Sequence, residues 1–133
     1  MGFKIYVSKN NISAKEFIDL SKSVGWGKTS GYEYSKVELA LKMSSFIVTV
    51  RDENYIVIGC GRALSDNLFF TTIPDIFVNP KFQRKGIGSL IMQKIIKKYS
   101  HTKIFLGSRP GNERFFEKLG FKKDLQSYAM KKQ

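Results

Sequence analysis

The sequence predicts an α/β protein built on a mixed sheet, and three observations lead to that class. Short apolar segments rich in β-branched and aromatic residues alternate with turn residues, which is typical of strands. Two other segments repeat apolar residues at helical spacing after a Ser-x-x-Glu capping box. Finally, a glycine-containing loop joins an apolar strand to a helix and then to another strand. Such a βαβ unit predicts two parallel strands.

The capping boxes are Ser13-Ala14-Lys15-Glu16 and Ser35-Lys36-Val37-Glu38, and each is expected to start a helix. Pro74 lies inside an apolar strand and cannot donate to a ladder, so it predicts a bulge or a departing neighbour strand. Asn112 is expected to cap the last helix. The expected elements, in chain order, are strand 3–8, helix 13–24, loop 28–34, helix 35–43, strands 46–51, 55–64 and 68–78, helix 86–99, strand 103–107, helix 112–119 and strand 127–131.

The length of 133 residues favours one domain, 1–133. Apolar content of 42% and charged content of 26% are ordinary for a globular protein. No apolar run approaches the roughly 20 residues that cross a bilayer, so no membrane span is expected. The N-terminal segment lacks the apolar core of a signal peptide. A cytoplasmic location is the simplest interpretation.

The charge balance points to an anionic partner. Lys and Arg total 23 against 11 acidic residues, a net charge of +12. Nucleic acid is disfavoured, because aromatic and basic residues do not interleave along one strand face as stacking platforms require. The single cysteine, Cys60, has no partner for an internal disulfide and is expected to be a buried core residue.

A phosphate-binding loop is predicted at Gln83-Arg84-Lys85-Gly86-Ile87-Gly88. Helix starts leave N–H groups unpaired and carry the positive end of the macrodipole. Glycines remove Cβ atoms that would block a ligand, and Arg84 and Lys85 add positive charge. Successive N–H groups from Gln83 to Ser89 can converge on a pyrophosphate. A bare strand–helix turn is the alternative.

This loop and a second motif, Phe115-Phe116-Glu117-Lys118-Leu119-Gly120-Phe121, resemble the GNAT superfamily of N-acetyltransferases. The loop resembles that family's Q/R-x-x-G-x-G/A pyrophosphate loop, and the second motif resembles its F-Y-E-K-x-G-F ending. The resemblance covers residues 3–131 and implies the GNAT fold: a mixed antiparallel/parallel central sheet, splayed at strands 4 and 5, with helices on both faces. It also implies acetyl-CoA as the acetyl donor, and dimers are common in the family, so a homodimer stays open.

The resemblance assigns the cofactor to particular residues. Main-chain groups of Phe77 and Val78 would pair with the pantetheine arm as an added strand. The other residues expected to bind coenzyme A are Gln83, Arg84, Lys85, Gly86, Ile87, Gly88, Ser89, Asn112, Phe115 and Phe116. Phe116 departs from the family, which often has a tyrosine there that protonates the leaving thiolate. Tyr32, Tyr128 or solvent could replace it. No metal site is expected.

Asp75 is the first candidate for the general base, because it is an acidic residue in an otherwise apolar strand just before the loop. The alternative is a structural or substrate-binding aspartate that pairs with Arg62. Glu33 is the second candidate. The resemblance places the loop between the first two helices at the acceptor, so Trp26 and Tyr32, with Arg62, are expected to contact the substrate.

The function expected from these residues is transfer of an acetyl group from acetyl-CoA to a primary amine, by direct attack of the bound amine. A small-molecule acceptor is expected. Two alternatives stay open, namely a protein or peptide N-acetyltransferase and a catalytically weak module that only binds acetyl-CoA.

Overall fold

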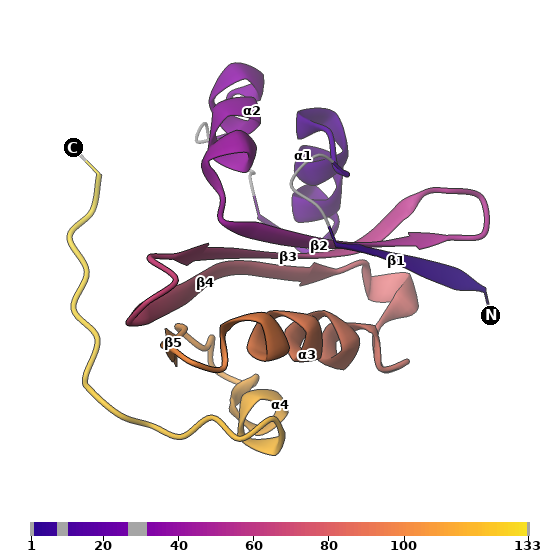
Figure 1. Cartoon of the computed structure of the whole chain (residues 1–133). Coiled ribbons are helices and arrows are strands. Elements are labelled where there is room, and N and C mark those ends of the chain that lie inside the picture. Colours follow the sequence, from indigo (N-terminus) through magenta and orange to yellow (C-terminus); the bar gives the residue numbers. More distant parts are fainter. Residues whose placement is uncertain (1, 8–10, 27–31, 133) are drawn as a thin grey trace.

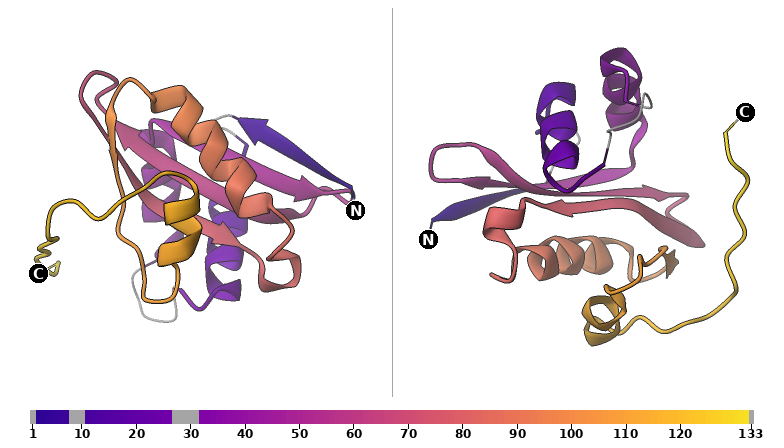
Figure 2. Two further views of the ribbon diagram at one scale, coloured as in Figure 1. Left: turned by 90° about the horizontal axis from the view of Figure 1, so that it is seen from below. Right: turned by 180° about the vertical axis from the view of Figure 1, so that it is seen from behind.

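The computed structural model describes residues 2–7, 11–26 and 32–132 (Figure 1). One five-stranded sheet lies between two layers of helices, with α1 and α2 on one face and α3 and α4 on the other (Figures 1 and 2). The elements are β1 (Phe3–Val7), α1 (Ala14–Ser23), α2 (Tyr34–Met43), β2 (Phe46–Asp52), β3 (Val57–Ser65), β4 (Phe70–Val78), η1 (Pro80–Phe82), α3 (Ile87–Tyr99), β5 (Lys103–Phe105) and α4 (Glu113–Lys118).

The strand order is β1-β2-β3-β4-β5, with antiparallel pairs up to β4 and a parallel β4–β5 pair. The predicted mixed sheet with helices on both faces is confirmed. The parallel pair also confirms the βαβ unit, because α3 crosses the sheet face between β4 and β5 (Figure 1).

The predicted irregularity at Pro74 is present. Arg62 of β3 lies opposite Asp75, and Leu64 lies opposite Thr72. An advance of two residues along β3 therefore corresponds to three residues along β4, which is a β-bulge. The extra residue bends β4 at Pro74. The ladder with β5 stops at Thr72, opposite Phe105. Beyond that point β4 has no strand beside it on this edge within the described part of the chain.

Two apolar cores lie on opposite faces of the sheet. The core beneath α3 contains Ile87, Ile91 and Ile95, which pack on β2, β3 and β4 together with Phe116. The core beneath α1 and α2 contains Phe17, and the Phe17 ring meets the Phe77 ring edge to face with centroids 5.7 Å apart. Side chains alternate across a strand, so Phe77 faces α1 while Ile76 and Val78 face α3.

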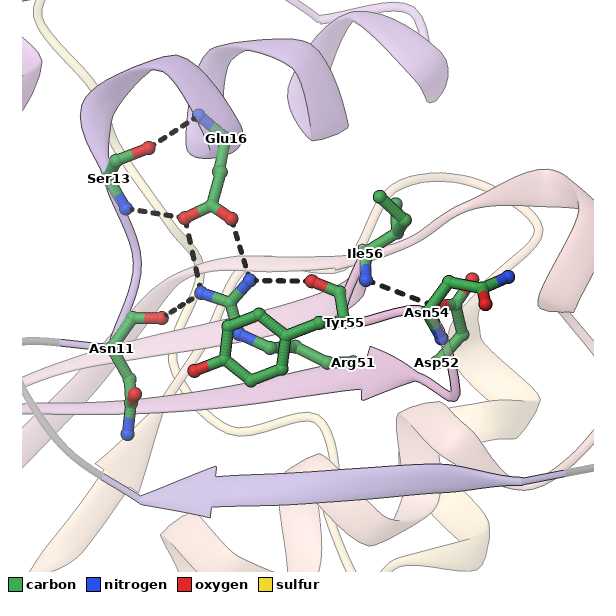
Figure 3. A network of polar contacts seen from close by, with 8 residues as sticks. All are labelled: Asn11, Ser13, Glu16, Arg51, Asp52, Asn54, Tyr55 and Ile56. Carbon is green, nitrogen blue, oxygen red and sulfur yellow. Dashed lines mark hydrogen bonds and ion pairs between the residues drawn. The ribbon is translucent and has the colours of Figure 1, made fainter.

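The first capping box forms as predicted. Ser13 Oγ accepts the Glu16 N–H at 3.1 Å, and the Glu16 carboxylate accepts the Ser13 N–H at 2.9 Å. The same carboxylate receives two bonds from the buried guanidinium of Arg51, at 2.6 and 3.1 Å (Figure 3). Arg51 also donates to the carbonyls of Asn11 and Tyr55. The start of α1 is therefore tied to β2 by a charged network.

Two local expectations are wrong, and a third is met only in part. Helix α2 begins at Tyr34, because the Val37 N–H already bonds the Glu33 carbonyl at 3.0 Å, so Ser35 lies within the first turn and forms no capping box. Asn112 is the N-cap of α4, as expected, but its side chain makes no cap hydrogen bond. Residues 127–131 form no strand in the single chain; they are exposed and run away from the body (Figure 1). Residues 28–31 of the expected loop 28–34 lie outside the described residues.

Candidate functional site

The loop before α3 has the backbone of an anion site. Arg84 has φ 63° and Gly86 has φ 83°, both in the left-handed region, and Gly86 is the N-cap of α3. The N–H groups of residues 84–89 find no hydrogen-bond acceptor among the described residues. Because α3 also presents the positive end of its macrodipole here, these donors suit a phosphate group.

The two glycines of this loop have different roles. A Cβ on Gly86 would meet nothing within 4 Å, so its left-handed φ is the reason for glycine there. A Cβ on Gly88 would lie 3.2 Å from Cζ of Phe115. The sequence predicts that both glycines admit a ligand. In the structure, Gly88 admits the Phe115 ring to the first turn of α3.

Gln83 fixes the loop to the end of β4. Its side-chain Nε2 donates to the Val78 carbonyl at 2.9 Å. This exposed side chain therefore joins the loop to the last residue of β4 at the protein surface. Phe77 and Val78 pair in register with Cys60 and Gly59 of β3. On the other edge of β4, no strand of the described residues lies beyond Thr72, and the Val78 carbonyl accepts the Gln83 bond.

A small cavity of about 100 Å³ opens where β4 and β5 separate. Residues from four parts of the chain line it: the end of α1, the bulged part of β4, the segment after β5, and α4. The lining residues are Trp26, Ile73, Pro74, Asp75, Ile76, Phe77, Leu106, Gly107, Arg109, Asn112 and Phe116. The structure thus brings together five residues predicted from the sequence, namely Trp26, Asp75, Phe77, Asn112 and Phe116.

Asp75 carries the carboxylate of this cavity and is paired with Arg62. Arg62 Nε donates to Asp75 Oδ2 at 2.6 Å, and the two side chains are 17% and 11% exposed. Arg62 also donates to Ser44 Oγ at 3.3 Å. The alternative in which Asp75 pairs with Arg62 is present in the structure. Its place on the cavity wall also keeps Asp75 accessible to a bound molecule.

The charges of the Arg62–Asp75 ion pair act on the hydroxyl of Tyr32. Burial raises the pKa of the Tyr32 hydroxyl above its ordinary value; the negative charge of Asp75 adds to the increase and Arg62 opposes it. Tyr32 therefore keeps its proton at neutral pH. Its ring packs edge to face on Phe17, with centroids 6.1 Å apart.

Arg109 is a site residue that sequence reasoning missed. Its guanidinium carbon lies 3.8 Å from the centroid of the Trp26 ring, and both side chains line the cavity. This cation–π contact joins the end of α1 to the segment after β5. The only sequence signal was position, because the residues that follow parallel strands commonly border ligand sites in α/β sheets.

Phe116 is 8% exposed and lines the cavity from α4. The turn after α4 holds it, since the Phe121 N–H returns to the Phe116 carbonyl at 3.1 Å and Gly120 has φ 101°. The Phe115 ring lies 5.0 Å from the Phe116 ring and packs toward α3. Phe116, which has no hydroxyl, thus lines the cavity, whereas Phe115 packs on the first turn of α3.

Other candidates lie away from the cavity. Glu33 is exposed and pairs with Lys36 at 3.6 Å, so the structure does not bring it to Asp75. Tyr128 is 89% exposed in the C-terminal segment. Cys60 is fully buried, as expected, and burial raises the pKa of its thiol to about 12. Among the described residues, no group of three or more potential metal ligands gathers.

Comparisons with known proteins agree on one family. A family model described as an acetyltransferase (GNAT) domain matches residues 25–132. The uncharacterized N-acetyltransferase ycf52 of Pyropia yezoensis is 39% identical over 127 residues, which are 90% of this chain and 71% of that protein. The GCN5-related N-acetyltransferase 2, chloroplastic, of Arabidopsis thaliana is 25% identical over 144 residues, covering 90% of this chain and 54% of that protein.

The fold has close structural neighbours. A GNAT family acetyltransferase from Streptococcus pneumoniae superposes with a TM-score of 0.84 at 22% identity, and the match covers 98% of each chain. At this identity the likeness concerns the fold alone. It agrees with the order of elements and with the splayed β4–β5 pair described above.

Proposed function

Because this chain belongs to the GNAT family of N-acetyltransferases, which use acetyl-CoA, we propose that it acetylates the primary amine of a small molecule by direct attack. The observation that carries this proposal is the cavity at the β4–β5 separation. Its volume of about 100 Å³ suits a small reacting group, and it holds a carboxylate, Asp75, beside an aromatic wall.

The residues present fit acetyl-CoA. The N–H groups of residues 84–89, with no acceptor among the described residues, would hold the pyrophosphate, and Arg84 and Lys85 add charge beside them. The bare edge of β4 at Phe77 and Val78 would pair with the pantetheine arm. When bound, the cofactor supplies an acetyl thioester to the acceptor amine. This loop and the cavity both lie at the bare edge of β4.

Asp75 is proposed as the general base, through water or by direct contact with the amine. Arg62 is proposed as a positioning residue, because its 2.6 Å bond fixes one carboxylate oxygen and leaves the other for the cavity. Phe116 can donate no proton. The leaving thiolate would then take its proton from solvent or from Tyr32, whose raised pKa keeps the hydroxyl protonated.

The acceptor itself is proposed to carry an anionic group next to its amine. Arg62 already neutralises Asp75, whereas Arg109 makes no ion pair with a described residue. The guanidinium carbon of Arg109 lies 3.8 Å from the centroid of the Trp26 ring, and a planar guanidinium binds carboxylate or phosphate through paired hydrogen bonds.

The test is a substrate comparison after calorimetry has measured acetyl-CoA binding. Thiol release would be followed with glucosamine 6-phosphate against glucosamine, with amino acids against their amides, and with lysine peptides. We expect the anionic amines to have the higher kcat/KM. Arg109→Gln should reduce that preference about tenfold or more, while Arg114→Gln, an exposed arginine on α4 outside the cavity lining, should leave it unchanged.

Each other outcome has a definite meaning. Turnover with lysine peptides alone would replace the small-molecule acceptor by a protein or peptide acceptor. Binding of acetyl-CoA without turnover of any amine would favour the weak cofactor-binding module.

Among the described residues, no helix is both long and apolar enough to cross a membrane. The cytoplasmic location stays a prediction, since the names of three relatives carry the word chloroplastic.

A further inference from the structure

Arg62 has a second anchor besides Asp75, and that anchor comes from a different element. Arg62 Nε donates to Asp75 Oδ2 at 2.6 Å, while Arg62 Nη1 donates to Ser44 Oγ at 3.3 Å. Ser44 is the C-cap of α2 and is fully buried. It does not line the cavity, so its connection to the site is its bond with Arg62.

Two anchors fix the guanidinium of Arg62 where one would not. A single bond through Nε would leave the plane of the group free to turn about that bond. Nε and Nη1 belong to the same rigid, planar group. Bonds from both atoms, one to β4 and one to the end of α2, therefore set the orientation of the plane. Because the plane holds Asp75 Oδ2, it also sets the direction of the second carboxylate oxygen.

The hydroxyl of Ser44 can only accept a bond from Arg62. Ser44 Oγ donates its hydrogen to the Ala40 carbonyl at 2.8 Å. A hydroxyl has one hydrogen and two lone pairs, so a lone pair is left for the guanidinium. Full burial keeps water from replacing either partner. The last turn of α2 therefore sets the direction of this acceptor.

The residue after Ser44 holds the end of α2 against β3. The Ser45 N–H donates to the Ala63 carbonyl at 3.0 Å, and Ser45 Oγ accepts the Ser65 N–H at 2.8 Å. Both partners follow Arg62 on β3, and the end of α2 runs directly into β2 beside that strand (Figure 1). The hydroxyl of Ser44 is thus held near Arg62 by bonds that do not involve the guanidinium.

The charge at the end of α2 also suits a cation. The last carbonyl groups of a helix carry the negative end of its macrodipole. The Arg62 guanidinium lies at this end of α2 through its bond to the C-cap residue, Ser44. A hydrogen bond and the helix dipole therefore both keep the positive charge beside Asp75.

We propose that Ser44 is a positioning residue for acetyl transfer. Its hydroxyl fixes Arg62, and Arg62 in turn holds the Asp75 carboxylate at the cavity wall. The role rests on the proposed function, in which Asp75 is the general base. Ser44 moves no proton of the reaction, so its loss slows the chemical step and leaves the affinity for the cofactor unchanged.

Hydrogen exchange at Arg62 tests the anchor without substrate or cofactor. The Nε–H signal would be followed by ¹⁵N NMR and assigned by its absence in Arg62→Lys. We expect Ser44→Ala to speed its exchange with water about tenfold, because the loss of one hydrogen bond to a charged group frees the guanidinium more often. An unchanged exchange rate would overturn the proposal.

Ser21→Ala is the matched control for this experiment. Ser21 is also fully buried on a helix, and its Oγ donates to the Ile18 carbonyl at 2.8 Å, but it bonds to no arginine among the described residues. We expect the exchange of the Arg62 Nε–H to be the same in Ser21→Ala as in the wild type. Equal acceleration in both variants would mean that any lost helix serine loosens the site, which would contradict a specific role for Ser44.

Steady-state kinetics test the consequence for the reaction. We expect Ser44→Ala to lower kcat about tenfold, while the calorimetric affinity for acetyl-CoA stays within about twofold of the wild type. Adding Ser44→Ala to Arg62→Lys should cause no further loss, because the hydroxyl acts through the guanidinium. Equal losses in the two backgrounds would show that Ser44 does not act through Arg62.

Asp75→Asn separates this role from the proposed base. Full turnover in Asp75→Asn would remove Asp75 as the base, and the exchange rate at Arg62 would still decide whether Ser44 anchors the arginine. Reduced turnover in Asp75→Asn together with an unchanged kcat in Ser44→Ala would keep the base and refute the positioning role.

Discussion

Arg62 and Asp75 lie directly opposite each other on β3 and β4, with Arg62 Nε 2.6 Å from Asp75 Oδ2. The bulge at Pro74 sets this register, because it adds one residue to β4 between Thr72 and Asp75. As a result, the carboxylate is both paired on one side and present on the cavity wall. A half-buried pair of this kind orients its members more than it stabilises the fold.

Asp75→Asn tests the proposed base. We expect turnover to fall by about 10² to 10⁴-fold, the usual contribution of general acid–base catalysis. The loss should be greatest at low pH, where most of the acceptor amine is protonated. The measurement is kcat/KM against pH, with Asp19→Asn on the exposed side of α1 as the control. An unchanged profile would assign proton removal to another group.

Phe116→Tyr restores a hydroxyl at the cavity wall. We expect activity to stay the same or rise, because the residue is at the cavity and a phenol could protonate the leaving group. Phe115→Tyr is the matched control and should give no gain, since that ring packs against Gly88. Single-turnover kinetics would measure both. A large loss in Phe116→Tyr would mean that the cavity has no space for the added oxygen.

Charge reversal tests the loop before α3. Arg84→Glu with Lys85→Glu should weaken coenzyme A binding about 100-fold or more, because two charges beside the unpaired N–H groups change sign. Lys94→Glu with Lys97→Glu makes the same change in net charge on exposed positions of α3 and should have little effect. Calorimetry at two salt concentrations would measure both. Equal weakening would point to the overall charge of +12 instead of the loop.

The Glu16–Arg51 pair predicts how stability depends on pH. The hydrogen bonds from Arg51 are the main cause that holds the pKa of Glu16 below its ordinary value of 4.5 in the folded state. The unfolded chain therefore takes up the proton first as the pH falls. The stabilisation is complete above pH 4.5 and is lost as the pH drops through the lower, folded value.

Glu16→Gln should remove this contribution. At pH 7 we expect a loss of about 1–2 kcal/mol, a modest value because Glu16 is 34% exposed to water. The acid-induced decline in stability should also become shallower. Urea unfolding between pH 3 and 7 would measure both, with Asp19→Asn as a control for an exposed pair on the same helix. If the free energy of unfolding fell equally with pH in Glu16→Gln and in the wild type, the acid-induced loss of stability would not come from Glu16.

Local features were predictable because their causes lie within a few residues. The capping box at Ser13 needs only Glu16 three residues on, and the left-handed start of α3 needs only Gly86. The bulge at Pro74 likewise follows from a missing N–H. These signals determined the order of elements, the splayed β4–β5 pair and the loop that the family uses for its cofactor.

Other features depend on residues that are distant in sequence, and only packing brings them together. Arg109 reaches Trp26 across more than 80 positions, and Arg51 reaches Glu16 from β2 to α1. Gly88 is required by the Phe115 ring, which no local pattern connects to it. Ser35 fits a capping box in sequence, but α2 begins one residue earlier.

The C-terminal segment shows the same division most clearly. Alternation at Tyr128 and Met130 determines a strand-forming pattern, but a strand also needs a free edge within reach. In the single chain Asp124 lies at Lys103 and the segment leaves the body, so the pattern finds no partner there. Sequence thus determined which residues can pair, and tertiary structure decided where they go, because pairing depends on the position of an edge in space.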